Sequence, residues 1–509
     1  MTRMQREPNE KPGEDVTATA PLSWLTVEVA LYGLIFLLGL VARLAALGRW
    51  PLLDTELNTA LAAWRTLKGS DWRPAQYVPL LYDADLLFFG LTRATDAAAR
   101  LLPALVGAAL VVVPYFSRDL LGRRGALAAA LLLAFSPTWL FVSRTADGAI
   151  LTVAASALLL LAVYRYGRSK EPQYLQLGTA ALALGLTSGA GCYTTLASAL
   201  AFGFIWWLVN RRDKKRVTSV FARLSAVVKQ VNPWVLVGVF TFFASGFIIN
   251  LGGIGASIGL AGRWVAGLAP DSSGLPWFYF PRALGVYEFL TIALALVGAV
   301  SGLRRRSTLD AFLITWVFLV LALGTLLGHR EPVWLADALL PLLILAARGV
   351  ERIWDHLAGG MTWSDASAAL IGFALLTSGF VELAVYTHSG QVQSLHYALA
   401  AWGVSIISWA ALALFSEWVG ALRVGAILLV LFMGIATVRT STALAYQTGR
   451  DPREMLVHRP TSAQLTDFEV FVATFTSRHV GDPTELDIVY EEGLGPQLIW
   501  ILRDYPKAR

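Results

Sequence analysis

Long blocks of apolar residues, divided by short polar segments, dominate the chain from residue 26 onwards. Most blocks approach the length of about 20 residues at which one helix crosses the hydrocarbon core of a bilayer. They are rich in Leu, Ala and Gly and lack strict alternation of apolar and polar residues, which excludes a transmembrane β-barrel. The pattern therefore predicts an all-α, polytopic membrane protein.

The blocks predict about 13 transmembrane helices. The candidate spans are residues 26–48, 101–117, 124–142, 148–164, 175–190, 194–209, 234–253, 284–303, 309–328, 333–349, 365–386, 396–416 and 422–439. They form a predicted transmembrane domain over residues 26–439. Residues 1–25 are mostly polar and contain Pro8, Pro12 and Pro21, which predicts a disordered cytoplasmic tail.

The positions of Lys and Arg set the expected orientation. One predicted loop contains Arg211, Arg212, Lys214, Lys215, Arg216, Arg223 and Lys229. The loops on the opposite side contain few cations, namely Arg144, Arg263, Arg282 and Arg330. Because positive loops stay in the cytoplasm, we expect a multi-pass protein of the cytoplasmic membrane with its N-terminus inside and its C-terminus outside. Anionic lipid headgroups then account for the net charge of +6, and no nucleic-acid partner is expected.

Two long segments are expected outside the membrane, residues 49–100 and residues 440–509. In the first, Leu57, Leu61, Trp64 and Leu67 recur at helical spacing, which predicts an amphipathic helix on the membrane surface. A second such helix is predicted over residues 84–102. In the C-terminal segment, a helical pattern from residue 462 and a predicted strand at residues 486–490 indicate a small α/β domain of about 50 residues.

Two carboxylates follow the first predicted span. Asp54 and Glu56 stand at the start of the helix predicted for the first outer loop. The helix dipole favours acidic residues there, so in one interpretation Asp54 simply caps the helix. In the other, one carboxylate is a general base that removes the proton of a sugar hydroxyl at the bilayer interface.

A second polar cluster, residues 143–148, forms a very short loop between two predicted spans. It places Arg144 and Asp147 close to the lipid boundary, where an ionised side chain is a functional hypothesis by default. A local Arg–Asp pair that anchors the helix ends is the alternative interpretation.

Two further clusters lie in predicted outer loops. The aromatic run at residues 276–281 includes Tyr279 and would form an interfacial belt or pack against a sugar or a lipid chain. Tyr287 and Glu288 follow, and Glu288 needs a partner near the start of an apolar span. His329 and Arg330 place positive charge on the side where cations are rare. A bound phosphate would explain Arg330, as would snorkelling to lipid headgroups.

Several classes of chemistry are excluded. The single cysteine, Cys192, permits neither an internal disulfide nor a cysteine metal cluster. The sequence contains no Walker loop, no Cys/His metal spacing and no serine-hydrolase elbow. We therefore expect no required cofactor and no metal ligands, although two nearby carboxylates could hold a divalent cation.

Taken in chain order, these clusters resemble bacterial GT-C-fold glycosyltransferases that use polyprenyl-phosphate sugars. These enzymes are relatives of the protein O-mannosyltransferases and the lipid A aminoarabinose transferase. The resemblance covers nearly the whole chain after residue 25. It rests on the helix count, the long first outer loop and several short segments. Those segments are residues 99–105, 135–137 with 143–144, 276–279 with 287–288, and 329–334 leading into 339–342.

The resemblance implies a membrane glycosyltransferase of the hexosyltransferase type. It would move a sugar from a polyprenyl-phosphate carrier to an unknown glycan, lipid or protein acceptor on the extracytoplasmic face, with inversion. Asp54 and Glu56 occupy the place of the family's acidic pair, one of which would be the base or orient the acceptor. The implied donor-phosphate ligands, which would stabilise the leaving group, are Arg144, His329 and Arg330. The implied substrate contacts are Asp147, Tyr279, Tyr287 and Glu288.

The chain also departs from the family pattern. Thr55 separates two acids that are usually adjacent, and Asn58 and Thr59 stand where a histidine is expected. These differences keep two alternatives open, a non-catalytic subunit of a membrane complex and a lipid or sugar transporter. A transporter would carry polar residues at mid-membrane and broken helices in related halves, whereas the polar clusters here gather on one face.

Overall fold

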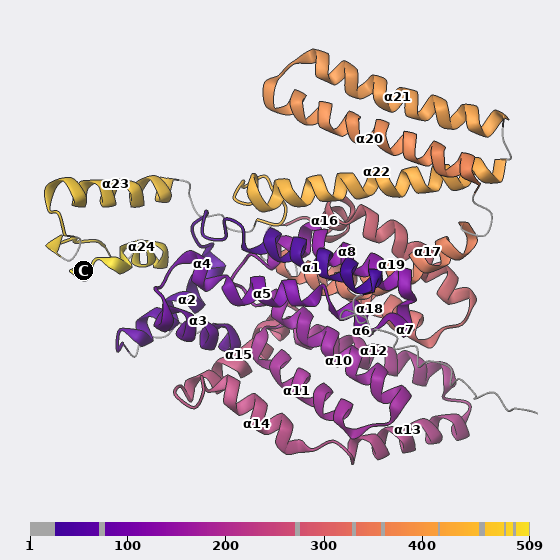
Figure 1. The fold of residues 1–509 in the computed structure, drawn as a ribbon. Coiled ribbons are helices and arrows are strands. Elements are labelled where there is room, and N and C mark those ends of the chain that lie inside the picture. The colour runs from indigo at the N-terminus through magenta and orange to yellow at the C-terminus, as the bar shows by residue number, and fades with distance from the viewer. Residues whose placement is uncertain are drawn as a thin grey trace, which may run out of the picture.

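The computed structural model describes residues 26–70, 77–269, 275–327, 332–357, 362–415, 418–457, 464–482, 485–491 and 495–507, and helices dominate these ranges (Figure 1). The first half contains α1 (Val27–Leu44), α2 (Asp54–Leu67), α3 (Pro79–Leu91), α4 (Asp96–Ala99), α5 (Leu101–Leu110), α6 (Val113–Phe116), α7 (Arg118–Leu121), α8 (Arg123–Phe135), α9 (Pro137–Val142), α10 (Ala149–Ser169), α11 (Pro172–Ser188), α12 (Gly191–Asn210), α13 (Lys214–Val228), α14 (Pro233–Ala244) and α15 (Gly252–Ala266). The second half contains α16 (Tyr279–Tyr287), α17 (Phe289–Arg304), α18 (Thr308–Leu326), η1 (Pro332–Trp334), α19 (Leu335–Leu357), α20 (Trp363–Ser389), α21 (Val392–Phe415), α22 (Trp418–Tyr446), α23 (Gln464–His479), α24 (Pro496–Ile501) and η5 (Leu502–Asp504).

The helices confirm the membrane class that the apolar blocks predict. Among the described residues, seven helices are long and apolar enough to cross a membrane, or up to nine if each of two bent helix pairs counts as one span. The predicted number of about 13 therefore stays a prediction. The expected span at residues 124–142 does not form one helix of the required length, because α8 has 13 residues and ends before α9 begins.

Small residues bring the central helices into close contact. In α17, a Cβ placed on Gly298 would lie 1.9 Å from the carbonyl oxygen of Leu345 in α19. In α19, a Cβ on Gly349 would lie 2.2 Å from the carbonyl oxygen of Leu294 in α17. Because Gly298 and Gly349 carry no side chain, the backbones of α17 and α19 can touch, as is common where helices pack in membranes.

Residues 49–100, the predicted first outer loop, contain helices, as predicted, but protein covers much of the apolar face of the first one. Leu57 and Leu61 of α2 are 1% and 0% exposed, and α2 packs on α3. They therefore belong to the core and do not form a surface for the membrane. The second helix, predicted over residues 84–102, is divided into α3, α4 and the start of α5. A new helix begins at α4 because the side chain of Thr95 accepts a hydrogen bond from the amide of Ala98 and so caps it.

The C-terminal segment docks onto this loop beside α2 and α4 (Figure 1). Trp500 of α24 donates its indole N–H to Asp96 at 2.6 Å, and its ring lies against Phe89 of α3. Arg503 donates to the carbonyl oxygen of Ala94 at 2.6 Å. The last described helix is therefore fixed to the same loop that carries Asp54.

The C-terminal segment is helical where an α/β arrangement is expected. Within the described ranges no strand is formed, and residues 486–490 are extended with a single β-bridge residue, Ile488. Leu486, Ile488 and Tyr490 instead pack against Val472 of α23 and Leu498 of α24. The alternation of apolar residues at 486, 488 and 490 predicts a strand. In the structure these apolar side chains pack on helices, so a β-sheet is not needed to bury them.

Two carboxyl groups of α3 are buried, and no hydrogen bond in the described part of the chain offsets their loss of contact with water. Asp83 and Asp85 are 1% and 0% exposed, and no hydrogen-bond partner for either is found in the described part of the chain. Burial raises the pKa of Asp83 to about 8 and the pKa of Asp85 well above its ordinary value. Both side chains are thus neutral acids near pH 7, because an isolated charge there would be too costly.

We predict that Asp83→Asn flattens the pH dependence of stability. The pKa of Asp83 lies near 8 in the folded protein and near 3.8 in the unfolded chain, so between these values the folded state holds the extra proton. Stability of the wild type therefore decreases as pH rises through this window, whereas asparagine has no proton to lose. Thermal unfolding between pH 5 and 9 measures both slopes, and equal slopes would contradict the prediction.

Candidate active site

A cavity of about 520 Å³ lies where the first outer loop meets the membrane helices. Its wall comes from α2, the residues before α3, the start of α10, the turn between α11 and α12, and from α15, η1, α19 and α24. Among the residues that line it, three carry carboxylates, Asp54, Asp147 and Asp337, and Arg263 supplies the positive charge. A cavity with this set of groups offers acceptors for the hydroxyl groups of a polar substrate.

Asp54 is the first residue of α2 and is partly exposed to the cavity. The capping position belongs to Leu53, whose backbone N–H donates to Glu56 at 2.6 Å. The carboxylate that caps the helix is therefore Glu56. Asp54 instead accepts a hydrogen bond on Oδ1 from the side-chain amide of Gln497, at 3.0 Å.

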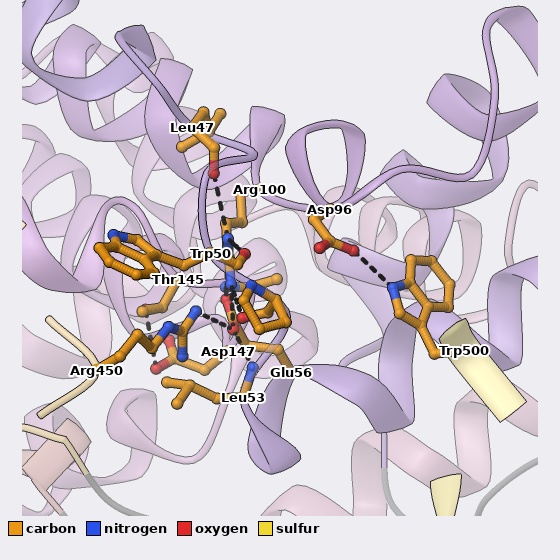
Figure 2. A network of polar contacts seen from close by, with 12 residues as sticks. Leu47, Trp50, Leu53, Glu56, Asp96, Arg100, Thr145, Asp147, Arg450 and Trp500 are labelled. Atoms are coloured by element: carbon orange, nitrogen blue, oxygen red, sulfur yellow. Dashed lines mark hydrogen bonds and ion pairs between the residues drawn. The ribbon is translucent and has the colours of Figure 1, made fainter. Parts of the chain in front are cut away.

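Glu56 lies behind the cavity wall in a network of buried ions (Figure 2). The side chain is 0% exposed. Arg100 donates to both of its oxygens, at 2.8 and 2.7 Å, and the amide of Ala146 donates to one of them at 2.7 Å. Burial alone would raise the pKa of Glu56, but the guanidinium of Arg100 outweighs it and the pKa falls to about 2. Glu56 is thus a permanent anion whose two oxygens are both occupied.

Arg450 approaches the same carboxylate from the segment after α22, at 3.4 Å (Figure 2). Two of the predicted substrate-binding residues hold this segment in place. Tyr279 donates to the carbonyl oxygen of Met455. Tyr287 donates to Glu454 at 2.5 Å and accepts from the amide of Met455 at 3.1 Å. The structure therefore gives both tyrosines a contact with the Arg450 segment, and their contact with substrate stays a prediction.

The two charged residues of the loop at residues 143–148, Arg144 and Asp147, lie in different surroundings. Asp147 lines the cavity, and its Oδ1 accepts from the amide of Ala149 at the start of α10, at 3.0 Å. Arg144 is 8% exposed. Its guanidinium donates to four carbonyl oxygens at the end of α1, those of residues 42, 43, 45 and 46, at 2.8 to 3.2 Å. Arg144 thus caps α1, whereas Asp147 lines the cavity, and its contact with substrate stays a prediction.

The remaining predicted residues lie away from the cavity or outside the described ranges. Glu288 is buried and accepts from Ser136 at 2.6 Å, from the amide of Thr138 at 3.1 Å and from Thr291 at 2.9 Å. It therefore satisfies the N-terminus of α9, which is the partner that its position requires. His329 and Arg330 lie outside the described residues.

Asp337 is a cavity residue that is not among the site residues predicted from the sequence. It is 6% exposed, lines the cavity, and no hydrogen-bond partner for its Oδ2 is found among the described residues. A Cβ on Gly191 would lie 2.5 Å from Oδ1 of Asp337 and 2.8 Å from Oγ1 of Thr152, so glycine keeps this corner open. The sequence does contain a signal for Asp337. It lies inside the predicted span 333–349, where an ionisable residue is expected to have a function.

We predict that Glu56→Gln strongly destabilises the protein. Removing the carboxylate leaves Arg100 and Arg450 buried without their anion, a change that typically costs about 3–5 kcal/mol. The folded pKa of about 2 is also below the ordinary value of 4.5, so the stabilisation is present above pH 4.5 and is lost as pH falls towards 2. Thermal unfolding in detergent tests both points. Asp54→Asn is the matched control and should unfold near the wild-type temperature.

Comparison with known proteins gives a family match over part of the chain and a shared fold. Residues 86–237 match the dolichyl-phosphate-mannose-protein mannosyltransferase family, whereas no curated protein sequence matches the chain. The structure is similar to ArnT from Cupriavidus metallidurans bound to undecaprenyl phosphate, with TM-score 0.58, 15% identity and coverage of 96% of this chain and 86% of that chain. The apo state of the same protein gives TM-score 0.59 at 14% identity, covering 94% and 86% of the two chains.

A second solved structure has the same fold. AglB, the oligosaccharyltransferase from Archaeoglobus fulgidus in complex with an inhibitory peptide and a dolichol-phosphate, has TM-score 0.50 at 14% identity and covers 95% of this chain and 64% of that one. The shared fold and the matching segment agree with the resemblance of the short sequence motifs. The chain is therefore a membrane protein with the GT-C fold of these structures, and its residues 86–237 are similar to the dolichyl-phosphate-mannose-protein mannosyltransferases.

Proposed function

We propose that this protein is a membrane glycosyltransferase that moves a sugar from a polyprenyl-phosphate carrier to an acceptor hydroxyl. The observation that supports the proposal most strongly is the cavity, in which Asp54 and Asp147 face the same space in a GT-C fold. ArnT and AglB, which share the fold, are described in complex with undecaprenyl phosphate and with a dolichol-phosphate. The same class of donor is therefore the first to test.

Asp54 is the proposed general base. A base must have an oxygen within hydrogen-bond reach of the attacking hydroxyl. Asp54 lines the cavity and has Oδ1 held by Gln497, which orients Oδ2. Glu56 cannot take this role, because Arg100, Ala146 and Leu53 already occupy its oxygens and its pKa is near 2. We therefore assign Glu56 to the positioning of α2, which carries Asp54.

The donor phosphate needs positive charge, because the carrier leaves as an anion. Arg263 of α15 lines the cavity and is the proposed ligand within the described residues. His329 and Arg330 remain proposed ligands, since Trp334, which follows them closely in the chain, also lines the cavity. Arg144 is less suited to this role, because four backbone oxygens already accept from its guanidinium.

The proposed reaction is a single displacement at the anomeric carbon. The acceptor oxygen forms a bond to this carbon as the bond to the phosphate oxygen breaks. The hydroxyl proton passes to Asp54, and the electron pair leaves with the polyprenyl phosphate. Cations placed around the leaving phosphate lower the barrier, because negative charge develops there in the transition state. One displacement from the opposite face inverts the configuration. No metal enters this scheme, and the absence of a metal requirement stays a prediction.

We predict that Asp54→Asn lowers the transfer rate by about 10²–10⁴, the usual contribution of a general base. The assay is transfer of label from a panel of polyprenyl-phosphate sugars into membrane extract by the purified protein. Asp83→Asn is the control, because it changes a buried carboxylate of the same loop that does not line the cavity. Full transfer by a folded Asp54→Asn variant would refute the assignment of the base. No transfer by the wild type with any donor would refute the proposed reaction.

We also predict that Asp337→Asn weakens binding of the donor sugar about 10- to 100-fold, the value of a hydrogen bond to a charged group. The reason is that Asp337 lines the cavity and that its buried Oδ2 has no hydrogen-bond partner among the described residues. Binding of bare polyprenyl phosphate should not change. Comparison of sugar-loaded and bare carriers in a binding assay tests this directly, and equal losses for both would place Asp337 outside the sugar subsite.

A further inference from the structure

A second cavity, of about 840 Å³, forms a groove along α22. Its walls come from α8, α17 and α19 on one side and from α20 and α22 on the other. Most of the lining is apolar, with Phe135, Leu290 and Leu294 facing the groove from the body of the protein and Phe373 and Phe380 facing it from α20. It shares no lining residue with the cavity around Asp54.

The helix hairpin α20–α21 explains why the groove exists. Its principal helix contacts are internal and with α22, and Figure 1 shows it as a separate layer beyond α22. Within the described part of the chain, α20 therefore packs mainly on α21 and α22, where Phe380 contacts Trp402 and Phe432. Because α20 and α22 are both candidate membrane spans, an apolar space along them favours a hydrocarbon chain over water.

Polar residues collect at one end of the groove. His388 at the end of α20 and Arg439 on α22 line this end and are exposed. Thr442 and Gln447 line it with them, and the described lining includes no Asp or Glu. This end lies on the side of the active-site cavity, because Tyr446 at the end of α22 donates to the carbonyl oxygen of Ala42 at 2.5 Å. Ala42 also accepts from Arg144, near the loop that carries Asp147.

We propose that this groove is a binding site for an anionic phospholipid. The acyl chain lies between α20 and the body of the protein, and the phosphate lies against Arg439 and His388. The charge at the rim selects an anion, because cations near a membrane surface attract acidic lipids. A sugar carrier is the less suitable occupant, because its phosphate has to reach the separate cavity around Asp54.

Gly434 allows a direct test of the acyl-chain site. It lines the groove in the middle of α22, and a Cβ built on it meets no atom within 4 Å. Gly434→Leu therefore places an apolar side chain in the groove at a position where its Cβ has open space. Gly403→Leu in α21 is the matched control, because its Cβ also meets nothing within 4 Å and it does not line the groove.

The experiment is native mass spectrometry of the purified full chain after incubation with phosphatidylglycerol, phosphatidylcholine or polyprenyl phosphate. We expect the wild type and Gly403→Leu to retain phosphatidylglycerol, and Gly434→Leu to retain about tenfold less, because each methylene displaced from the groove loses its burial. Equal retention by all three proteins would overturn the site. Retention of polyprenyl phosphate in place of phosphatidylglycerol, lost in Gly434→Leu, would overturn the phospholipid assignment and give the groove to the carrier.

Arg439→Gln tests the headgroup site separately. The wild type should prefer phosphatidylglycerol over phosphatidylcholine, and the variant should reduce this preference about fivefold, the usual effect of one cation near a membrane surface. An unchanged preference would exclude Arg439 from the headgroup site. Because these measurements need no sugar transfer, they stand or fall independently of the proposed enzymatic function.

Discussion

The carboxylate of Glu56 holds together four parts of the chain that meet at the cavity. Its oxygens accept from the start of α2, from Arg100 before α5, from the loop before α10 and from Arg450 after α22. Two guanidinium groups this deeply buried would repel each other without an anion between them. The network therefore determines how α2 stands against the membrane helices, and through α2 it places Asp54 at the cavity wall.

The arrangement of the two acids follows from helix geometry. Successive residues of an α-helix are turned by about 100°, so residues two apart point to nearly opposite sides. Asp54 and Glu56 in α2 therefore cannot both face one cavity, and Thr55 between them enforces the division of roles. The sequence alone shows that the roles must differ. It does not show which acid is buried, because the partner Arg450 lies 394 residues further along the chain.

Other features show the same limit. The apolar blocks predict where helices run, because crossing lipid requires long apolar stretches, and the polar clusters predict which end of the helices carries chemistry. The partners of individual side chains depend on contacts between distant segments. Arg144 contacts the end of α1 and Glu288 contacts the start of α9, and neither contact leaves a local pattern. Asp337 is the exception, since its place inside an apolar span already marks it.

The hydrogen bond between Gln497 and Asp54 joins positions 443 residues apart. A ribosome that makes this protein adds Asp54 443 residues before it adds Gln497. The membrane helices can insert and pack while translation continues, but the partner of Asp54 is absent until α24 has been made and has docked. The cavity thus acquires the part of its wall that α24 supplies only after α24 has been synthesised, so shorter nascent chains in the membrane carry an incomplete site.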